Sequence, residues 1–128
     1  KVFISIDDDN KKFILTIVKK LIDLNFIIVA TKGTAKFLND NDLHVEMINK
    51  VKEGGSHIVK AIADNQIDLV INTTKTQGSI RDSYSIRRTS LTFNIPYYTT
   101  IAGAKVAVDT IEHLKNNSLK VKSLQDLI

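Results

Sequence analysis

The chain has 128 residues, of which 43% are apolar and 25% charged, as expected for one globular domain with a substantial core. It contains no cysteine, which excludes disulfides and thiolate metal sites, and no apolar run reaches the roughly 18 to 20 residues of a membrane span. The formal charge of +4 suits anionic partners, but the lysines are scattered and aromatic residues make up only 6%, so we expect no nucleic-acid partner.

The first half of the chain alternates apolar runs with amphipathic segments. KVFISI (1–6) is typical of a strand, and FIIVA (26–30) of a strand covered on both faces. A helix is predicted between them from about Asp9 to Leu24, with N-cap candidates at residues 7–10. A short helix from Thr34 and a strand near residues 44–48 follow. The apolar stripe of the first helix contains Phe13, Ile14, Ile17, Val18, Leu21 and Ile22.

The second half repeats this alternation. Helices are predicted at about residues 56–63, 80–93 and 104–114, and strands at IDLVIN (67–72) and PYYTT (96–100). The tail, LKVKSLQDLI (119–128), suggests a last short strand or helical turn. Five rounds of strand and helix predict a doubly wound α/β fold, in which a parallel sheet carries helices on both faces.

In such a sheet, ligands bind at the carboxyl ends of the strands, which makes the loop VATKGTA (29–35) a candidate site. A helix that starts near Thr34 would present free backbone N–H groups to a phosphate, Gly33 would allow close approach, and the hydroxyls of Thr31 and Thr34 would add donors. A plain strand-to-helix turn, with Thr34 as N-cap and Gly33 at a positive φ, fits the same residues. This loop alone does not separate the two interpretations.

Lysines near this edge favour an anion site. Lys11 lies in the first turn of its helix, where a positive charge opposes the helix dipole. Either the acids at residues 7–9 neutralise it, or it faces Thr31 and Thr34 and binds an anion. Lys50, after the third strand, would supply a second charge.

Two further loops end at the same edge. In VINTTKTQGSIRDS (70–83), we expect Asn72, Thr73 and Thr74 to expose groups that could read a base or ribose, or else to form a polar turn. PYYTTIAG (96–103) adds Tyr97 and Thr99. We interpret the acids at residues 7–9 as helix caps rather than Mg²⁺ ligands, and we expect no metal site.

Several motifs in order carry a family resemblance: VATKGTA (29–35), INKVKEG (48–54), DLVINTT (68–74), IRDSYSIRR (80–88) and PYYTTIAGA (96–104). Together they resemble the C-terminal allosteric domain of the carbamoyl phosphate synthetase large subunit, which is a methylglyoxal-synthase-like domain. The resemblance covers nearly the whole chain and implies a single domain over residues 1–128 with strand order 3-2-1-4-5. It also implies a regulator without catalytic residues. Because the chain starts at Lys1 rather than methionine, we expect a domain excised from a longer chain, or one trimmed to its ordered part.

The resemblance implies two effector sites. In bacterial relatives UMP inhibits and IMP activates through overlapping sites, and ornithine activates at the junction with the synthetase body. By motif, Tyr97 and Thr99 match positions that touch ornithine. The implied nucleotide and phosphate site consists of Lys11, Thr31, Gly33, Thr34, Lys50, Asn72, Thr73 and Thr74.

The implied partners are the synthetase body of the same large chain and the small glutaminase subunit, in the cytoplasm, with a homo-oligomer left open. No membrane contact is expected. ATP with Mg²⁺ or Mn²⁺ would belong to the parent enzyme, which makes carbamoyl phosphate for pyrimidine and arginine synthesis. This domain itself would need no cofactor.

Two departures from related patterns bear on function. The residues after NTT are Lys75, Thr76, Gln77 and Gly78, where some relatives carry a glycine and an arginine pair, so the choice between UMP and IMP stays open. The rival interpretation is the enzyme methylglyoxal synthase, in which an aspartate follows a glycine pair. Ser56 takes that place here, and a serine cannot act as the general base.

Overall fold

The sheet of the computed structural model contains five parallel strands in the order β3-β2-β1-β4-β5. The structure describes residues 1–48, 58–73 and 77–126, with only the backbone described for 77–83 and 117–126. In the register, Val2 lies opposite Ile28 on one side and Leu69 on the other. The predicted class and strand order are therefore confirmed. The strands are β1 (Val2–Ser5), β2 (Ile28–Ala30), β3 (Glu46–Met47), β4 (Leu69–Asn72) and β5 (Tyr97–Tyr98).

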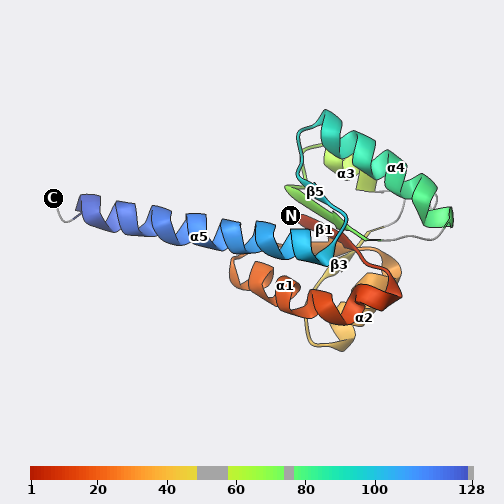
Figure 1. The fold of residues 1–128 in the computed structure, drawn as a ribbon, viewed down its shortest axis with the longest axis horizontal. Coiled ribbons are helices and arrows are strands. Elements are labelled where there is room, and N and C mark those ends of the chain that lie inside the picture. The colour runs from red at the N-terminus through yellow and green to blue at the C-terminus, as the bar shows by residue number, and fades with distance from the viewer. Residues whose placement is uncertain (49–57, 74–76, 127–128) are drawn as a thin grey trace.

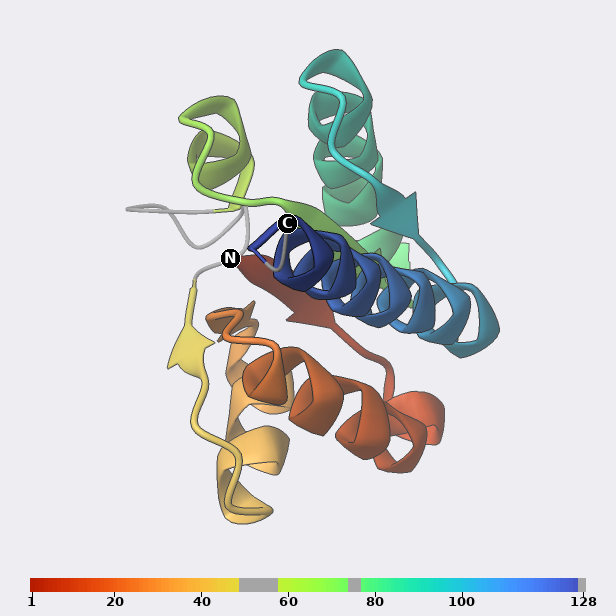
Figure 2. The same ribbon diagram turned by 90° about the vertical axis from the view of Figure 1, so that its left-hand side faces the viewer.

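Helices cover both faces of the sheet (Figures 1 and 2). One face carries α1 (Lys11–Asp23), α2 (Lys32–Asp40) and α5 (Ile101–Asp126), and the other carries α3 (Ile58–Ala63) and α4 (Gln77–Thr92). A 3-10 turn, η1 (Asp8–Asn10), joins β1 to α1. The strand order reverses between β1 and β4, which is where open α/β sheets leave a crevice for ligands.

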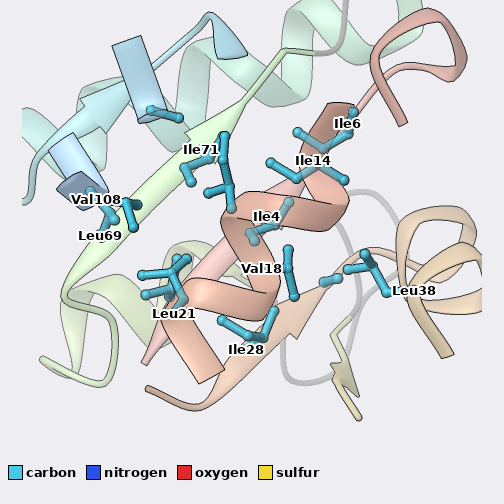
Figure 3. Close-up of a cluster of buried hydrophobic side chains, with 14 of the residues drawn as sticks. Ile4, Ile6, Ile14, Val18, Leu21, Ile28, Leu38, Leu69, Ile71 and Val108 are labelled. Carbon is cyan, nitrogen blue, oxygen red and sulfur yellow. The ribbon is translucent and has the colours of Figure 1, made fainter. Parts of the chain in front are cut away.

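The core divides into two clusters because successive strand residues point to opposite faces. Val2 and Ile4 of β1 pack with α1, α2 and α5, whereas Phe3 between them packs with α3 and α4. Figure 3 shows the first cluster, in which Ile14, Val18 and Leu21 of α1 lie over the strands. The predicted stripe of α1 is largely buried, except that Phe13 is 54% exposed.

In the described part of the chain, four helices are followed, two residues after their last residue, by an asparagine or aspartate in the left-handed region, with φ between 57° and 70°. After α1, for example, the Asn25 N–H donates to the Ile22 carbonyl at 2.9 Å, and the Phe26 N–H donates to the Leu21 carbonyl at 3.0 Å. This is the Schellman arrangement, which satisfies the last carbonyls of a helix. The four residues are Asn25, Asp42, Asn65 and Asn94.

Several predicted boundaries are wrong. The C-terminal tail is not a separate strand or turn, because α5 continues for 26 residues and extends beyond the sheet (Figure 1). Helix α2 begins at Lys32, so Thr31 is its N-cap and Gly33 lies in its first turn. Asp7 and Asn10 hold the N-cap positions of η1 and α1, but neither side chain makes a capping hydrogen bond.

Within residues 1–48, 58–73 and 77–126, no helix combines the length and apolar character needed to cross a lipid bilayer.

Candidate functional site

Several of the polar residues predicted for the site lie at the carboxyl ends of β1, β2 and β4. Thr31 and Thr34 lie at the start of α2, immediately after β2, and both are buried. Lys11 at the start of α1 reaches over the same turn: its Nζ lies 3.7 Å from the position that a Cβ on Gly33 would occupy. Lys11, Thr31, Gly33 and Thr34 therefore come together as expected.

The threonine hydroxyls form a chain that ties α2 to the end of β1. The Thr34 Oγ1 accepts a hydrogen bond from the Ile6 backbone N–H at 3.1 Å. Thr31 Oγ1 lies 3.4 Å from both Ser5 Oγ and Thr34 Oγ1. These last two distances are long for O–H···O hydrogen bonds, so both contacts are weak.

Lys11 is held at this edge by an acid from the preceding turn. Its Nζ lies 2.5 Å from Asp8 Oδ1, and the exposed fraction is 21% for the lysine side chain and 91% for the aspartate. The next residue, Lys12, points elsewhere, with its Nζ 5.0 Å from the centroid of the Phe13 ring. The two neighbouring lysines therefore differ in environment, and only Lys11 faces the first turn of α2.

Asp7 and Thr73 connect the carboxyl ends of β1 and β4. Thr73 Oγ1 accepts the Asp7 backbone N–H at 3.2 Å and donates a short hydrogen bond to Asp7 Oδ1. Asn10 also donates to Asp7 Oδ1, at 2.8 Å. The expectation that Thr73 exposes its hydroxyl is wrong, because this side chain is buried and joins two strand ends.

Asn72 connects this edge to the last strand. It is 3% exposed, which corrects the prediction of an exposed amide, and its Nδ2 donates to the Tyr97 phenol oxygen at 3.0 Å. Burial raises the pKa of Tyr97, while the hydrogen bond from Asn72 and the nearby Arg87 guanidinium oppose that rise. Thr99 is exposed in the turn between β5 and α5.

Other predicted residues fall outside the described part of the chain. These are Lys50, Thr74 and the triplet Gly54, Gly55 and Ser56 on which the argument against methylglyoxal synthase rests. Ser5 and the roles of Asp7 and Asp8 were not predicted from the sequence. Ser5 was detectable as the single hydroxyl in an otherwise apolar strand, just where that strand ends.

Two hollows beside α5 are lined by described residues other than those of the predicted site. One, of about 260 Å³, lies between α1 and α5 and is lined by Phe13, Ile17 and Val108 among others. The other, of about 580 Å³, includes Leu69 and Pro96 near the starts of β4 and β5. Among the described residues, no three His, Cys, Asp or Glu side chains are grouped closely enough to hold a metal ion.

Comparison with known families identifies the domain. The model of the MGS-like domain family matches residues 13–99. The chain belongs to this family. The match includes Thr31, Gly33, Thr34, Asn72 and Tyr97, and it begins just after Lys11.

This MGS-like domain has close relatives among carbamoyl phosphate synthase large chains. It is 46% identical to that of Mesorhizobium japonicum, over 97% of this chain and 11% of the relative. The carbamoyl phosphate synthase large chain of Brucella suis biovar 1 is 47% identical, over 98% of this chain and 11% of the relative. A "Carbamoyl phosphate synthase large chain, C-terminal section" from Methanopyrus kandleri is 43% identical, over 97% and 23%. The resemblance noted from the motifs is thus confirmed, and the chain spans 11% of the length of the first two relatives.

The fold of the MGS-like domain is also found in a solved structure. The methylglyoxal synthase of Elizabethkingia anophelis NUHP1 superposes with a TM-score of 0.63, covering 84% of this chain and 76% of that one. The two are 20% identical, so the likeness concerns the fold alone.

Proposed function

We propose that this MGS-like domain is the regulatory domain of a carbamoyl phosphate synthase large chain, and that it binds the phosphate group of a nucleotide at the carboxyl edge of its sheet. The observation that carries the proposal is the position of the Lys11 amino group over the first turn of α2, beside Thr31 and Thr34. A helix N-terminus offers backbone N–H groups and a positive dipole end, and a lysine adds a full positive charge.

The effectors proposed for this site are UMP as inhibitor and IMP as activator, and Tyr97 and Thr99 would contact ornithine together with acids of the synthetase body. The partners would be that body and the glutaminase subunit, in the cytoplasm, with ATP and a divalent cation bound outside this domain. Lys50 and Thr74 would complete the nucleotide site. The identity of over 40% with carbamoyl phosphate synthase large chains supports this assignment.

Regulation would act as a shift between two states of the parent enzyme. An effector that binds one state more tightly favours that state, and substrates must change effector affinity by the same factor. Such coupling energies are typically about 1 to 3 kcal/mol. The domain by itself should therefore show effector binding, whereas control of carbamoyl phosphate synthesis needs the whole large chain.

Calorimetric titration of the 128-residue chain with UMP and then IMP tests the proposal. We expect saturable binding of at least one nucleotide, weakened about tenfold or more in Lys11→Ala, because a hydrogen bond to a charged group contributes about 1.5 to 3 kcal/mol. Lys12→Ala is the matched control: it removes the same charge from the neighbouring position and should bind normally.

The result that would overturn the proposal is the absence of binding of either nucleotide to the unaltered chain, or equal losses in the two lysine variants. The second outcome would mean that net charge, rather than a site at the edge of the sheet, attracts the nucleotide. A parallel assay with dihydroxyacetone phosphate addresses the enzymatic alternative, since turnover to methylglyoxal would show a catalyst rather than a regulator.

A further inference from the structure

The hydrogen bond between Asn72 and Tyr97 connects the carboxyl edge of the sheet, where we propose that the nucleotide binds, to the loop that leads into α5. Asn72 ends β4 and Tyr97 begins β5, and these two strands are neighbours in the sheet. The distance between Asn72 Nδ2 and the Tyr97 phenol oxygen is 3.0 Å. Because the amide is almost fully buried, it cannot rotate without exchanging this partner.

We propose that Tyr97 is a positioning residue for the nucleotide site, which fixes the Asn72 amide and transmits occupancy of the site to the β5–α5 loop. The inference rests on the proposed function, because it requires that a nucleotide base or ribose contacts Asn72. It adds a direct connection between two groups of residues that the family resemblance assigns to different ligands.

The packing of β5 and the short loop after it determine which part of the chain moves when Tyr97 is displaced. Tyr97 packs with the cluster under α3 and α4, while Tyr98 packs with the opposite cluster beside α5. Only Tyr98, Thr99 and Thr100 separate Tyr97 from the start of α5 at Ile101. Thr100 caps this helix, since its Oγ1 accepts the Gly103 N–H at 3.0 Å. A displacement of Tyr97 therefore passes into a short, tethered loop.

The connection works in both directions. A nucleotide group that hydrogen-bonds with the Asn72 amide favours the orientation that Tyr97 holds, and a ligand that moves Tyr97 disturbs this orientation and weakens nucleotide binding. Thermodynamic linkage makes the two effects equal in size. Inorganic phosphate would bind beside Lys11 and the start of α2 without contacting Asn72. Its affinity should therefore not change when Tyr97 is substituted.

This difference between ligands gives the test. Tyr97→Phe keeps the ring in place but removes the hydroxyl, and we expect affinity for UMP or IMP to fall about threefold to tenfold, the size of one net hydrogen bond. Affinity for inorganic phosphate should be unchanged. Tyr98→Phe is the matched control, because it removes a hydroxyl from the adjacent residue on the other face and should bind both ligands normally.

A spectroscopic measurement reports on the same bond. The chain has three tyrosines and no tryptophan, so Tyr84→Phe combined with Tyr98→Phe leaves Tyr97 as the single phenol. Nucleotide and inorganic phosphate should both raise the pKa of this phenol, followed by tyrosinate absorbance, through their negative charge. The nucleotide should raise it less, because it holds the Asn72 amide in the orientation that donates to the phenol oxygen.

Each outcome decides the matter. Nucleotide affinity that is unaffected by Tyr97→Phe would overturn the inference while leaving the proposed function in place. An equal loss of phosphate and nucleotide affinity would also overturn it, since that pattern indicates general loosening of the edge. If the unaltered chain binds neither UMP nor IMP, the proposed function falls first and this inference falls with it.

Discussion

The Nζ of Lys11 lies 2.5 Å from Oδ1 of Asp8, so the amino group at the edge of the sheet already has a carboxylate partner. The aspartate side chain is 91% exposed, which leaves it free to move into solvent when an anion arrives. Asp8 therefore competes with any phosphate for Lys11, and the competition must lower affinity.

Removal of this competitor should strengthen binding. We expect Asp8→Asn to raise affinity for inorganic phosphate and for nucleotides about twofold to fivefold, the range for an exposed ion pair. Asp9→Asn is the control, because it makes the same charge change at the next exposed residue. Equal gains in the two variants, measured by calorimetry at low salt, would show that net charge rather than the Asp8–Lys11 pair sets the affinity.

The Thr34 hydroxyl should contribute to stability as well as to binding. Thr34→Val leaves the Ile6 N–H without its acceptor in a buried position, which should lower the free energy of unfolding by about 1 to 3 kcal/mol. Thr34→Ser keeps the oxygen and should retain most of the stability. Urea unfolding followed by circular dichroism measures both, and a valine variant as stable as the unaltered chain would refute the role.

The helix ends give a second stability prediction. Asn65 follows α3 with φ of 59°, a conformation that disfavours residues with a Cβ, although asparagine tolerates it well. Asn65→Ala should destabilise the fold by about 1 kcal/mol, while Asn65→Gly should be neutral or stabilising. Thermal unfolding of the pair checks this. An equal loss of stability in the two variants would mean that the amide itself, rather than the backbone angle, matters here.

The contribution to stability of the ion pair between α1 and α5 should depend on pH. Lys20 Nζ lies 2.7 Å from Asp109 Oδ1, and this hydrogen bond lowers the pKa of Asp109, while the same bond raises the pKa of Lys20. For a lowered carboxyl pKa, the stabilisation is present above the ordinary value near 3.8 and is lost as the pH falls through the folded-state value.

Asp109→Asn should therefore lower the melting temperature slightly at neutral pH and lose this difference from the unaltered chain in strong acid. Added salt should shrink the difference, because both side chains are partly exposed. Melting curves from neutral to strongly acidic pH test the prediction. A difference that persists in strong acid would point to packing rather than charge.

The architecture could be predicted from the sequence because most of its signals are local. Apolar runs such as FIIVA (26–30) and the stripe of α1 report burial directly. The strand order is not a local signal, and it was implied by the family resemblance that the quoted motifs carry. The helix ends were harder to predict, since asparagine and aspartate take the places that glycine usually marks. The extension of α5 was missed because the alternation of apolar residues and lysines in LKVK (119–122) also fits a short strand.

The candidate site was likewise predictable only in part. That Lys11, Thr31 and Thr34 converge follows from where their strands end, so topology alone predicts it. The burial of Asn72 and Thr73 could not be predicted, because it depends on partners far away in the chain: Tyr97 for Asn72 and Asp7 for Thr73. Sequence patterns identify polar residues at the edge of a sheet, whereas only the structure shows which of them are hydrogen-bonded to each other.

The most direct measurement of the central claim is a two-dimensional ¹⁵N–¹H NMR titration of the 128-residue chain with UMP, IMP and inorganic phosphate. The account predicts saturable shifts of the Gly33 and Thr34 backbone amides with all ligands that bind, because their phosphate lies at the first turn of α2 beside Lys11. Shifts confined to amides elsewhere in the chain, such as those of residues that line the hollows along α5, would contradict a phosphate site at the first turn of α2.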